Sequence, residues 1–278
     1  MRDSLQFLKM SASGNDFIVI DNREGSADRL FPDTPEFVKK VCRRRLSVGA
    51  DGLILIEKSA TVDFAWRFYN ADGSVAEMCG NGGRCAARFA YVKGIAGQTM
   101  AFATLAGTMK AQVNQDGSVK LQLGVPQDLK LDYPIWLDNK ELFVSSVNTG
   151  VPHTILLTDR IDRAPVEKLG RPIRHHKVFP TGTNVDFVEI VDRENVRIRT
   201  YERGVEGETF ACGTGAVAVG VVLKAKGLVE SMVNILTRGG EVVRVYVDGE
   251  VYLEGSARII YGGTLFQEAI EYEAGNDE

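Results

Sequence analysis

The chain has 278 residues, of which 44% are hydrophobic and 25% charged, and its formal net charge is -4 at pH 7. This is the composition of a soluble globular protein long enough for two domains, and its mild acidity argues against nucleic acid as the main partner. Residues 1–17 carry no export signal pattern, and the longest apolar run, 211–223, is too short to cross a bilayer. We therefore expect a cytoplasmic protein with reduced thiols and without a membrane partner.

In chain order, the first half predicts two helices separated by strands. A helix is expected over 34–44, with Thr34 as its N-cap and a proline at the next position. Residues 61–68 alternate polar and apolar side chains, which predicts a strand. A second helix is expected over 82–93, after a glycine-rich segment, and the Asp-Gly pair at 116–117 predicts a hairpin turn.

The second half carries the same kinds of element. In order they are a short helix over 165–169 ended by Gly170, alternating strands over 195–201 and 241–247, a helix over 213–226, and an Asp-Gly hairpin turn at 248–249. The helix over 213–226 is apolar around nearly its whole circumference, which places it inside a domain.

Several positions of the first half recur in the second. Cys79-Gly80-Asn81-Gly82 is matched by Cys212-Gly213-Thr214-Gly215, and Met100, Gly107 and Asp116 recur 132 residues later as Met232, Gly239 and Asp248. This period is far longer than that of solenoid repeats, so it indicates two similar lobes.

We therefore predict an α+β fold of two pseudo-symmetric lobes, each a mixed, mostly antiparallel β-barrel around a central helix. The N-terminal lobe would span 1–125 and carry Cys79, and the C-terminal lobe would span 126–262 and carry Cys212. We expect residues from about 263 to 278 to return to the first lobe as a strand.

Two of the four cysteines, Cys79 and Cys212, precede the helices that the duplication places at equivalent positions. The N-terminus of a helix favours a thiolate, so each thiol is predicted to have a lowered pKa and to serve as an acid or a base on one substrate. A free cysteine is more often a small buried hydrophobe, which is our interpretation of Cys42 and Cys85. No metal site is expected, because the chain lacks a Cys-x-x-Cys pair and has only three histidines.

Neither glycine-rich turn fits a nucleotide phosphate motif, so a carboxylate is the expected anion. Glu202 and Arg203 are suited to bind an ammonium and a carboxylate, although a surface ion pair is an equal alternative. His153 is expected to have a supporting role at most, since a lone histidine is more often structural.

Seven motifs in combination resemble the diaminopimelate epimerase family over essentially the whole chain. They are Ser13–Phe17, Tyr69–Ser74, Met78–Cys85, Pro152–His153, Gly182–Val185, Glu202–Glu208 and Ala211–Ala216. The resemblance implies a cofactor-independent enzyme that interconverts LL- and meso-2,6-diaminopimelate in lysine and peptidoglycan precursor synthesis. It also implies a homodimer and a site in a cleft between the lobes.

The resemblance further implies a role for individual residues. Cys79 and Cys212 would be the catalytic base and acid. The implied substrate contacts are Asn15, Asn70, Gly80, Asn81, Asn184, Glu202, Arg203, Gly213 and Thr214. Val151 and Gly52 depart from the family, since many members have asparagine and glutamine there.

Two other functions are compatible with the sequence. One is an amino-acid racemase of the proline or hydroxyproline type on the same scaffold, which a substrate panel would distinguish. The other is an amino-acid-binding protein in which Cys79 and Cys212 form a redox switch, which would bind a diamino acid without exchanging its α-proton.

Overall fold

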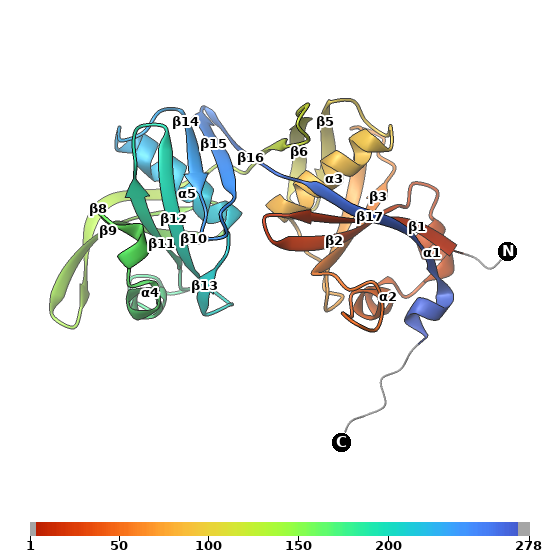
Figure 1. Cartoon of the computed structure of the whole chain (residues 1–278), viewed down its shortest axis with the longest axis horizontal. Helices are drawn as coiled ribbons and strands as arrows, with labels where there is room; N and C mark the ends of the chain where they lie inside the picture. Colours follow the sequence, from red (N-terminus) through yellow and green to blue (C-terminus); the bar gives the residue numbers. More distant parts are fainter. Residues whose placement is uncertain (1–3, 272–278) are drawn as a thin grey trace, which may run out of the picture. The chain divides into compact units, whose positions relative to one another are not determined.

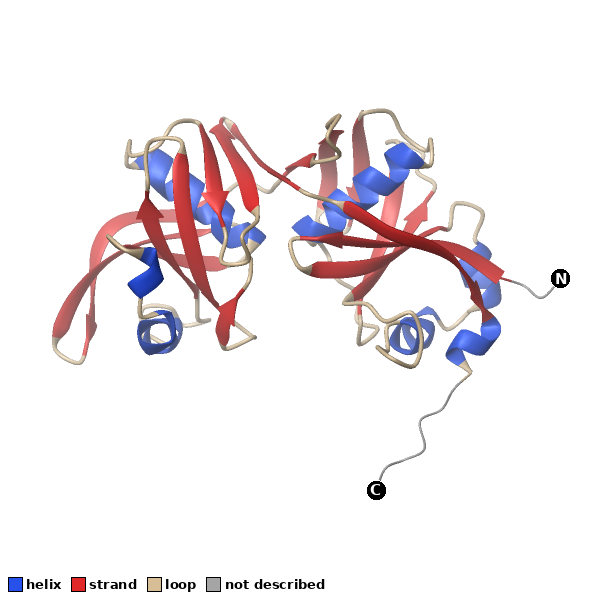
Figure 2. Ribbon diagram, in the orientation of Figure 1, coloured by secondary structure: helices blue, strands red, loops and turns tan. Residues whose placement is uncertain are grey.

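The computed structural model describes residues 4–271, and these form two compact units (Figure 1). The first unit comprises 4–121 together with 256–271, and the second comprises 122–255. Both are built mainly of strands, with a few helices (Figure 2).

The first unit begins and ends with strands that lie next to each other. Its elements are β1 (Ser4–Ala12), β2 (Asn15–Asp21), α1 (Ser26–Leu30), α2 (Thr34–Val41), β3 (Gly52–Glu57), β4 (Phe64–Asn70), α3 (Gly80–Val92), β5 (Thr99–Thr104), β6 (Gly107–Val113), β7 (Val119–Gln122), β17 (Arg258–Phe266) and the 3-10 helix η2 (Gln267–Ile270).

The strands of the first unit pair in the order β17-β1-β2-β3-β4-β5-β6-β7. The β2–β3 and β4–β5 pairs are parallel and the others are antiparallel. Helix α3 contacts β1, β2 and β3 near one end of this order and β6 near the other. The sheet therefore curls around α3, as the ribbon shows (Figure 1).

The second unit has a corresponding set of elements. They are β8 (Gln127–Leu137), β9 (Lys140–Asn148), β10 (Pro152–Leu157), the 3-10 helix η1 (Ile161–Arg163), α4 (Val166–Arg174), β11 (Asn184–Ile190), β12 (Asn195–Glu202), β13 (Gly207–Thr209), α5 (Gly213–Ala225), β14 (Met232–Leu236), β15 (Val242–Asp248) and β16 (Glu250–Gly255).

Its main strands pair in the order β8-β9-β10-β11-β12-β14-β15-β16, with β10–β11 and β12–β14 parallel and the others antiparallel. The order of parallel and antiparallel pairs along the sheet is therefore the same in the two units. Helix α5 contacts β9, β10 and β11 on one side and β15 and β16 on the other. The predicted duplication is confirmed by this shared topology.

Strands in the middle of each sheet are buried on both faces, which explains their continuous apolar runs. In β3 the residues Gly52 to Ile56 are all buried. Leu53 and Leu55 pack with Phe37 and Val41 of α2, so α2 covers the outer face of the sheet and α3 the inner face. In the second unit, α4 and α5 contact β11 in the same way.

Three predicted boundaries of α2 and α4 are wrong. Asp33, not Thr34, caps α2 by accepting a hydrogen bond from the Glu36 N–H at 3.2 Å, and α2 ends at Val41. Helix α4 continues through Gly170, where we expected it to end. A Cβ atom at Gly170 would lie 2.6 Å from the Tyr201 side chain, so this glycine permits close packing on β12 and does not end the helix.

The last strand returns to the beginning of the chain. β17 pairs antiparallel with β1, from Ser4 opposite Phe266 to Ser11 opposite Arg258. Residues 272–278, the end of the expected returning segment, lie outside the described residues.

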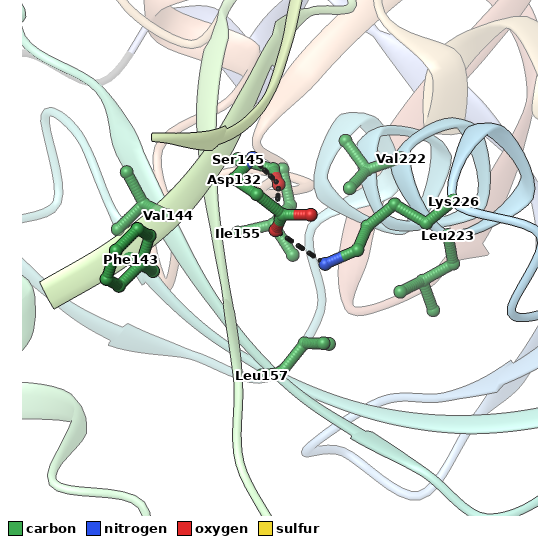
Figure 3. A pocket seen from close by; sticks show the side chains of 9 residues that line it. All are labelled: Asp132, Phe143, Val144, Ser145, Ile155, Leu157, Val222, Leu223 and Lys226. Carbon is green, nitrogen blue, oxygen red and sulfur yellow. Dashed lines mark hydrogen bonds and ion pairs between the residues drawn. The ribbon is translucent and has the colours of Figure 1, made fainter. Parts of the chain in front are cut away.

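A cavity of about 260 Å³ lies in the second unit between the β8–β9 hairpin and the C-terminal end of α5 (Figure 3). Its lining includes an ion pair between Lys226 Nζ and Asp132 Oδ1 at 2.7 Å, and most of its other side chains are apolar. None of the predicted site residues lines this cavity.

Candidate active site

Cys79 occupies the N-cap of α3, because this helix begins at Gly80 and not at Gly82 as expected. Its backbone is extended (φ -146°, ψ 120°), and its Sγ accepts a hydrogen bond from the Gly82 N–H at 3.4 Å. Cys79 as a residue is partly exposed, whereas Cys85 in the same helix is fully buried. The sulfur therefore takes the place of the oxygen of an ordinary N-cap side chain.

Asn81 and Asn15 are held together beside Cys79. Asn81 Nδ2 donates to Asn15 Oδ1 at 2.7 Å, and Asn81 Oδ1 accepts from Arg84 Nη2 at 2.8 Å. Arg84 is fully buried and also donates to Ser13 Oγ at 2.7 Å. These contacts fix the orientation of both amides, since the oxygen of each faces a donor.

A charged network anchors the other side of Asn15. Asn15 Nδ2 donates to Asp51 Oδ2 at 3.1 Å, and Arg44 Nη2 lies 2.6 Å from Asp16 Oδ1 and 2.8 Å from Asp51 Oδ1. Lys9 Nζ lies 2.9 Å from Asp16 Oδ2. Paired carboxylates and cations make this end of β2 a rigid support for Asn15.

Asn70 is exposed at the end of β4, where its Nδ2 donates to Ser74 Oγ at 3.0 Å. It lies directly opposite Gly52 in the β3–β4 pair. A Cβ atom at Gly52 would lie 2.6 Å from the carbonyl oxygen of Tyr69, so a larger residue would require this backbone to move. Gly52 thus allows β3 to pack closely against the end of β4.

In the second unit, Cys212 occupies the N-cap of α5, also with an extended backbone (φ -130°, ψ 109°). Cys212 as a residue is partly exposed, and its Sγ lies 3.4 Å from Thr214 Oγ1 in the first turn of the helix. Gly213 is the first residue of α5. Cys79 and Cys212, the two predicted catalytic residues, therefore both occupy the N-cap of a helix, but their sulfurs have different polar neighbours.

His153 lies behind Thr214 and is fully buried. Its Nε2 lies 3.0 Å from Thr214 Oγ1, and its Nδ1 lies 2.7 Å from Oδ2 of Asp186, which is also fully buried. The other oxygen of Asp186 accepts from Thr200 Oγ1 at 2.7 Å. Thr214 Oγ1 is therefore within 3.0 Å of His153 Nε2 and within 3.4 Å of Cys212 Sγ.

Asn184 and Arg203 come together at the start of β11. Asn184 Oδ1 accepts from the Arg203 N–H at 2.8 Å, and Asn184 Nδ2 donates to the Pro152 carbonyl at 3.1 Å. The Arg203 guanidinium donates to the Thr181 carbonyl at 3.2 Å. Glu202 is half-buried and close enough for its negative charge to act on Cys212. Asn184, Arg203 and Glu202 therefore supply an amide, a cation and an anion near the start of β11 and the end of β12.

The predicted lowering of the thiol pKa values is wrong for the free protein. Burial raises the pKa of Cys79, although hydrogen bonds from the backbone of Gly82 and Asn81 and the charge of Arg84 act in the opposite direction. Burial, with the negative charges of Asp186 and Glu202, raises the pKa of Cys212 to about 12. Desolvation opposes the thiolate more strongly than the helix N-terminus favours it. A proton must therefore leave one thiol before that cysteine can act as a base.

Sequence reasoning missed Arg84 and Asp186. Arg84 stands in an otherwise small and apolar stretch of α3, and Asp186 stands in a buried strand two positions after Asn184. An ionisable residue in an apolar segment was the available signal, because such groups are buried only with polar partners.

Within residues 4–271, no cluster of three or more histidine, cysteine, aspartate or glutamate side chains could hold a metal ion. None of the helices in this range combines the length and apolar character needed to cross a membrane.

Comparison with known proteins identifies the family. The family model described as Diaminopimelate epimerase matches residues 7–129 and 145–260. The diaminopimelate epimerase of Aquifex aeolicus (strain VF5) is 46% identical over 280 residues, which cover 96% of this chain and 100% of the relative. That of Archaeoglobus fulgidus is 38% identical and covers 97% of this chain and 99% of the relative.

Solved structures show the same fold at low identity. A phenazine biosynthesis protein of the PhzF family from Bacillus anthracis has a TM-score of 0.69 at 15% identity, covering 95% of this chain and 99% of its own. A hydroxyproline epimerase from Agrobacterium vitis has a TM-score of 0.65 at 19% identity, covering 96% and 94%. The predicted fold class is confirmed, and the chain belongs to the diaminopimelate epimerase family and is an isomerase.

Proposed function

We propose that this isomerase interconverts LL- and meso-2,6-diaminopimelate by moving a proton between the substrate Cα and two cysteine thiols, without a cofactor. Its place would be in lysine and peptidoglycan precursor synthesis. The observation that carries the proposal is the equivalent position of Cys79 and Cys212, each partly exposed at the N-cap of the central helix of its unit. Membership of the family supports the choice of substrate.

In the proposed reaction, one cysteine acts as a thiolate and removes the α-proton. The other cysteine, as a thiol, donates a proton to the opposite face of the same carbon, which inverts it. The roles of Cys79 and Cys212 are exchanged in the reverse direction. The reaction therefore requires both sulfurs to reach one α-carbon in the substrate complex.

The carbanion needs electrostatic stabilisation, because a general acid and base supply only about 10²–10⁴-fold acceleration. The first turns of α3 and α5 have N–H groups without a partner in their own helix, and these point toward the N-cap. Gly80 and Gly213 begin these turns, and the absence of side chains lets a carboxylate approach the N–H groups closely. Negative charge that builds on the reacting carboxylate would be stabilised there.

The remaining polar residues would select a substrate with two amino-acid ends. In the first unit Asn15, Asn70 and Asn81 would contact it, and in the second unit Asn184, Glu202, Arg203 and Thr214 would do so. A substrate the size of proline has no second ammonium and carboxylate for Glu202 and Arg203 to bind. A diamino dicarboxylic acid has both an ammonium group for Glu202 and a carboxylate for Arg203.

The proposal includes a homodimer that works in the cytoplasm on a small molecule. It also includes lobes bounded at about residue 125, with the end of the chain returning to the first lobe. Sedimentation velocity measures the oligomeric state, and a monomer at all concentrations would contradict the dimer.

The decisive test is incubation with LL-diaminopimelate in heavy water. We expect deuterium at one α-carbon together with formation of the meso isomer, and loss of inversion in Cys79→Ala and in Cys212→Ala. Cys42→Ala is the matched control, because Cys42 is buried at the end of α2.

Two outcomes would favour the alternatives. Exchange into L-proline or trans-4-hydroxy-L-proline but not into diaminopimelate would favour a racemase. Binding of diaminopimelate without exchange in the presence of reductant would favour a redox-switched binding protein.

A further inference from the structure

Arg174 is the last residue of α4 and contacts two loops of the second unit at once. The first loop, residues 203–206, joins β12 to β13, and the second, residues 175–183, joins α4 to β11. We propose that Arg174, through its ion pair with Glu206, is a positioning residue that holds Arg203 ready for the carboxylate at the second amino-acid end of the substrate. This role rests on the proposed function, because it matters only if Arg203 binds the substrate.

The contact with the first loop is made through one carboxylate oxygen. Arg174 Nε donates to Glu206 Oε1 at 3.0 Å, and Arg174 Nη2 lies 3.0 Å from the same oxygen. The Gly204 N–H also donates to this oxygen, at 3.1 Å. His175 Nε2 lies 3.4 Å from the other oxygen, but its side chain is largely exposed, so we assign the main contact to Arg174. The ion pair therefore fixes the backbone directly after Arg203.

Glu206 has a backbone conformation that needs support from its surroundings. Its φ of 58° lies in the left-handed region, which residues other than glycine rarely occupy. The Glu206 N–H donates to the Glu202 carbonyl at 2.9 Å. The hydrogen bond from Gly204 and the charge of Arg174 lower the pKa of the Glu206 carboxyl, so it is ionised at neutral pH. An ionised carboxylate with a paired cation therefore holds this turn closed.

The same arginine packs against the second loop. A Cβ atom at Gly182 would overlap Arg174 Nη1, so the guanidinium rests directly on this glycine. The Arg174 carbonyl accepts a hydrogen bond from the Thr183 N–H at 3.4 Å. Gly182 and Thr183 are buried and lead directly to Asn184 at the start of β11. The Arg174 side chain is only 15% exposed, so its ion pair is less screened by solvent than one on the open surface.

The two loops meet at Arg203, whose own contacts come from both sides. Its backbone N–H donates to Asn184 Oδ1 at 2.8 Å, and its guanidinium donates to the Thr181 carbonyl at 3.2 Å. A carbonyl orients the guanidinium without neutralising its charge, whereas the charge of Arg174 is matched by Glu206. The two arginines therefore have different roles: Arg203 is suited to bind a substrate carboxylate, and Arg174 holds in place the loops that aim it.

The first test is the Arg174→Met variant, which keeps an unbranched apolar stem beside Gly182 but lacks the guanidinium. We expect the KM for diaminopimelate to increase about tenfold and kcat to stay within about twofold, because the ion pair acts on binding of the second end and not on the reacting carbon. Arg171→Met is the matched control, since Arg171 is an exposed arginine in the same last turn of α4, and it should change neither constant. A lower kcat with an unchanged KM in Arg174→Met, as a smaller folded fraction would give, would overturn the proposal.

Glu206→Asn tests the other partner of the ion pair. Asparagine adopts the left-handed conformation readily, but it is neutral and one methylene shorter than glutamate. This variant should raise KM by about as much as Arg174→Met. The double variant should have a KM within about twofold of the weaker single variant, because the contact is already broken. Multiplied effects of about a hundredfold would show that the two residues act separately and would contradict the proposal.

Hydrogen–deuterium exchange of the free protein tests the contact without substrate. The amides of residues 203–206 and of Thr183 should exchange about tenfold faster in Arg174→Met and in Glu206→Asn, and at the wild-type rate in Arg171→Met. Unchanged exchange in both ion-pair variants would overturn the proposal. Circular dichroism establishes whether each variant folds, and Glu206→Asn decides the question if Arg174→Met does not.

The two readouts separate the failure of this inference from that of the proposed function. A wild-type protein that does not exchange the α-proton of diaminopimelate refutes the proposed function, and the role of Arg174 in substrate binding fails with it even if the loops exchange faster in the variants. Normal turnover by the wild type, together with an unchanged KM in both ion-pair variants, refutes the role of Arg174 only.

Discussion

The equivalent glycines of the two Cys-Gly-x-Gly motifs should respond in opposite ways to the same substitution. Gly82 and Gly215 both lie in the first turn of a central helix, three residues after the cysteine. A Cβ atom at Gly82 would meet its nearest neighbours, which include Ile54 and Trp66, at 3.4–3.5 Å, which is ordinary van der Waals contact. A Cβ atom at Gly215 would lie 2.7 Å from Asp186 Oδ1, so either the helix or the carboxylate must shift.

The expected magnitudes follow from these contacts. Alanine in a helix is more favourable than glycine by about 0.5–1 kcal/mol, so Gly82→Ala should increase the free energy of unfolding of the first unit by about that amount. Gly215→Ala has the same gain but an overpacking cost of about 1–3 kcal/mol, so it should leave the second unit unchanged or less stable by up to about 2.5 kcal/mol. It should also displace Asp186 or the first turn of α5, and so change the rate of alkylation of Cys212.

The assay is hydrogen–deuterium exchange of α3 and α5 in each variant, combined with cysteine alkylation. Exchange in α3 reports on Gly82→Ala and exchange in α5 on Gly215→Ala, so each unit is the control for the other. If Gly215→Ala stabilised α5 as much as Gly82→Ala stabilises α3, with unchanged alkylation of Cys212, the reasoning from the Asp186 contact would be refuted.

Three further predictions concern the first unit. Arg84→Met should slow alkylation of Cys79 but not of Cys212, because it removes the buried cation whose charge favours the Cys79 thiolate; equal rates in variant and wild type would contradict this. Burial raises the pKa of Asp16, but the hydrogen bonds and charges of Arg44 and Lys9 outweigh it and lower the pKa to about 2, from 3.8. The ion pairs should therefore contribute about 2 kcal/mol of stability above pH 4 that is lost as the pH falls toward 2, and acid unfolding of Asp16→Asn should lack this dependence. Cys42→Ala should leave the rate of α-proton exchange within about twofold of wild type, and a larger loss would show that this buried thiol is not a bystander.

Local sequence signals determined the plan of the molecule. The recurrence of Cys-Gly-x-Gly and of the Asp-Gly turns identified a duplication, and the pairing order of the two sheets agrees with it. The N-cap positions of Cys79 and Cys212 were also predictable, because helix initiation depends on residues within one turn. The end of α4 was not predictable, since Gly170 serves packing against Tyr201, which is distant in the sequence.

Only the tertiary structure decided how the two thiols are tuned. His153, Asp186 and Thr214 come from two strands and a helix, and they meet because β10 and β11 pair in parallel beneath the start of α5. The sequence indicated that the helix N-termini favour thiolates, but it could not weigh this against desolvation, which depends on everything that packs around the sulfur. Helix initiation depends on residues close together in the sequence, whereas the desolvation of Cys212 and the negative charges of Asp186 and Glu202 beside it arise only once distant strands have come together.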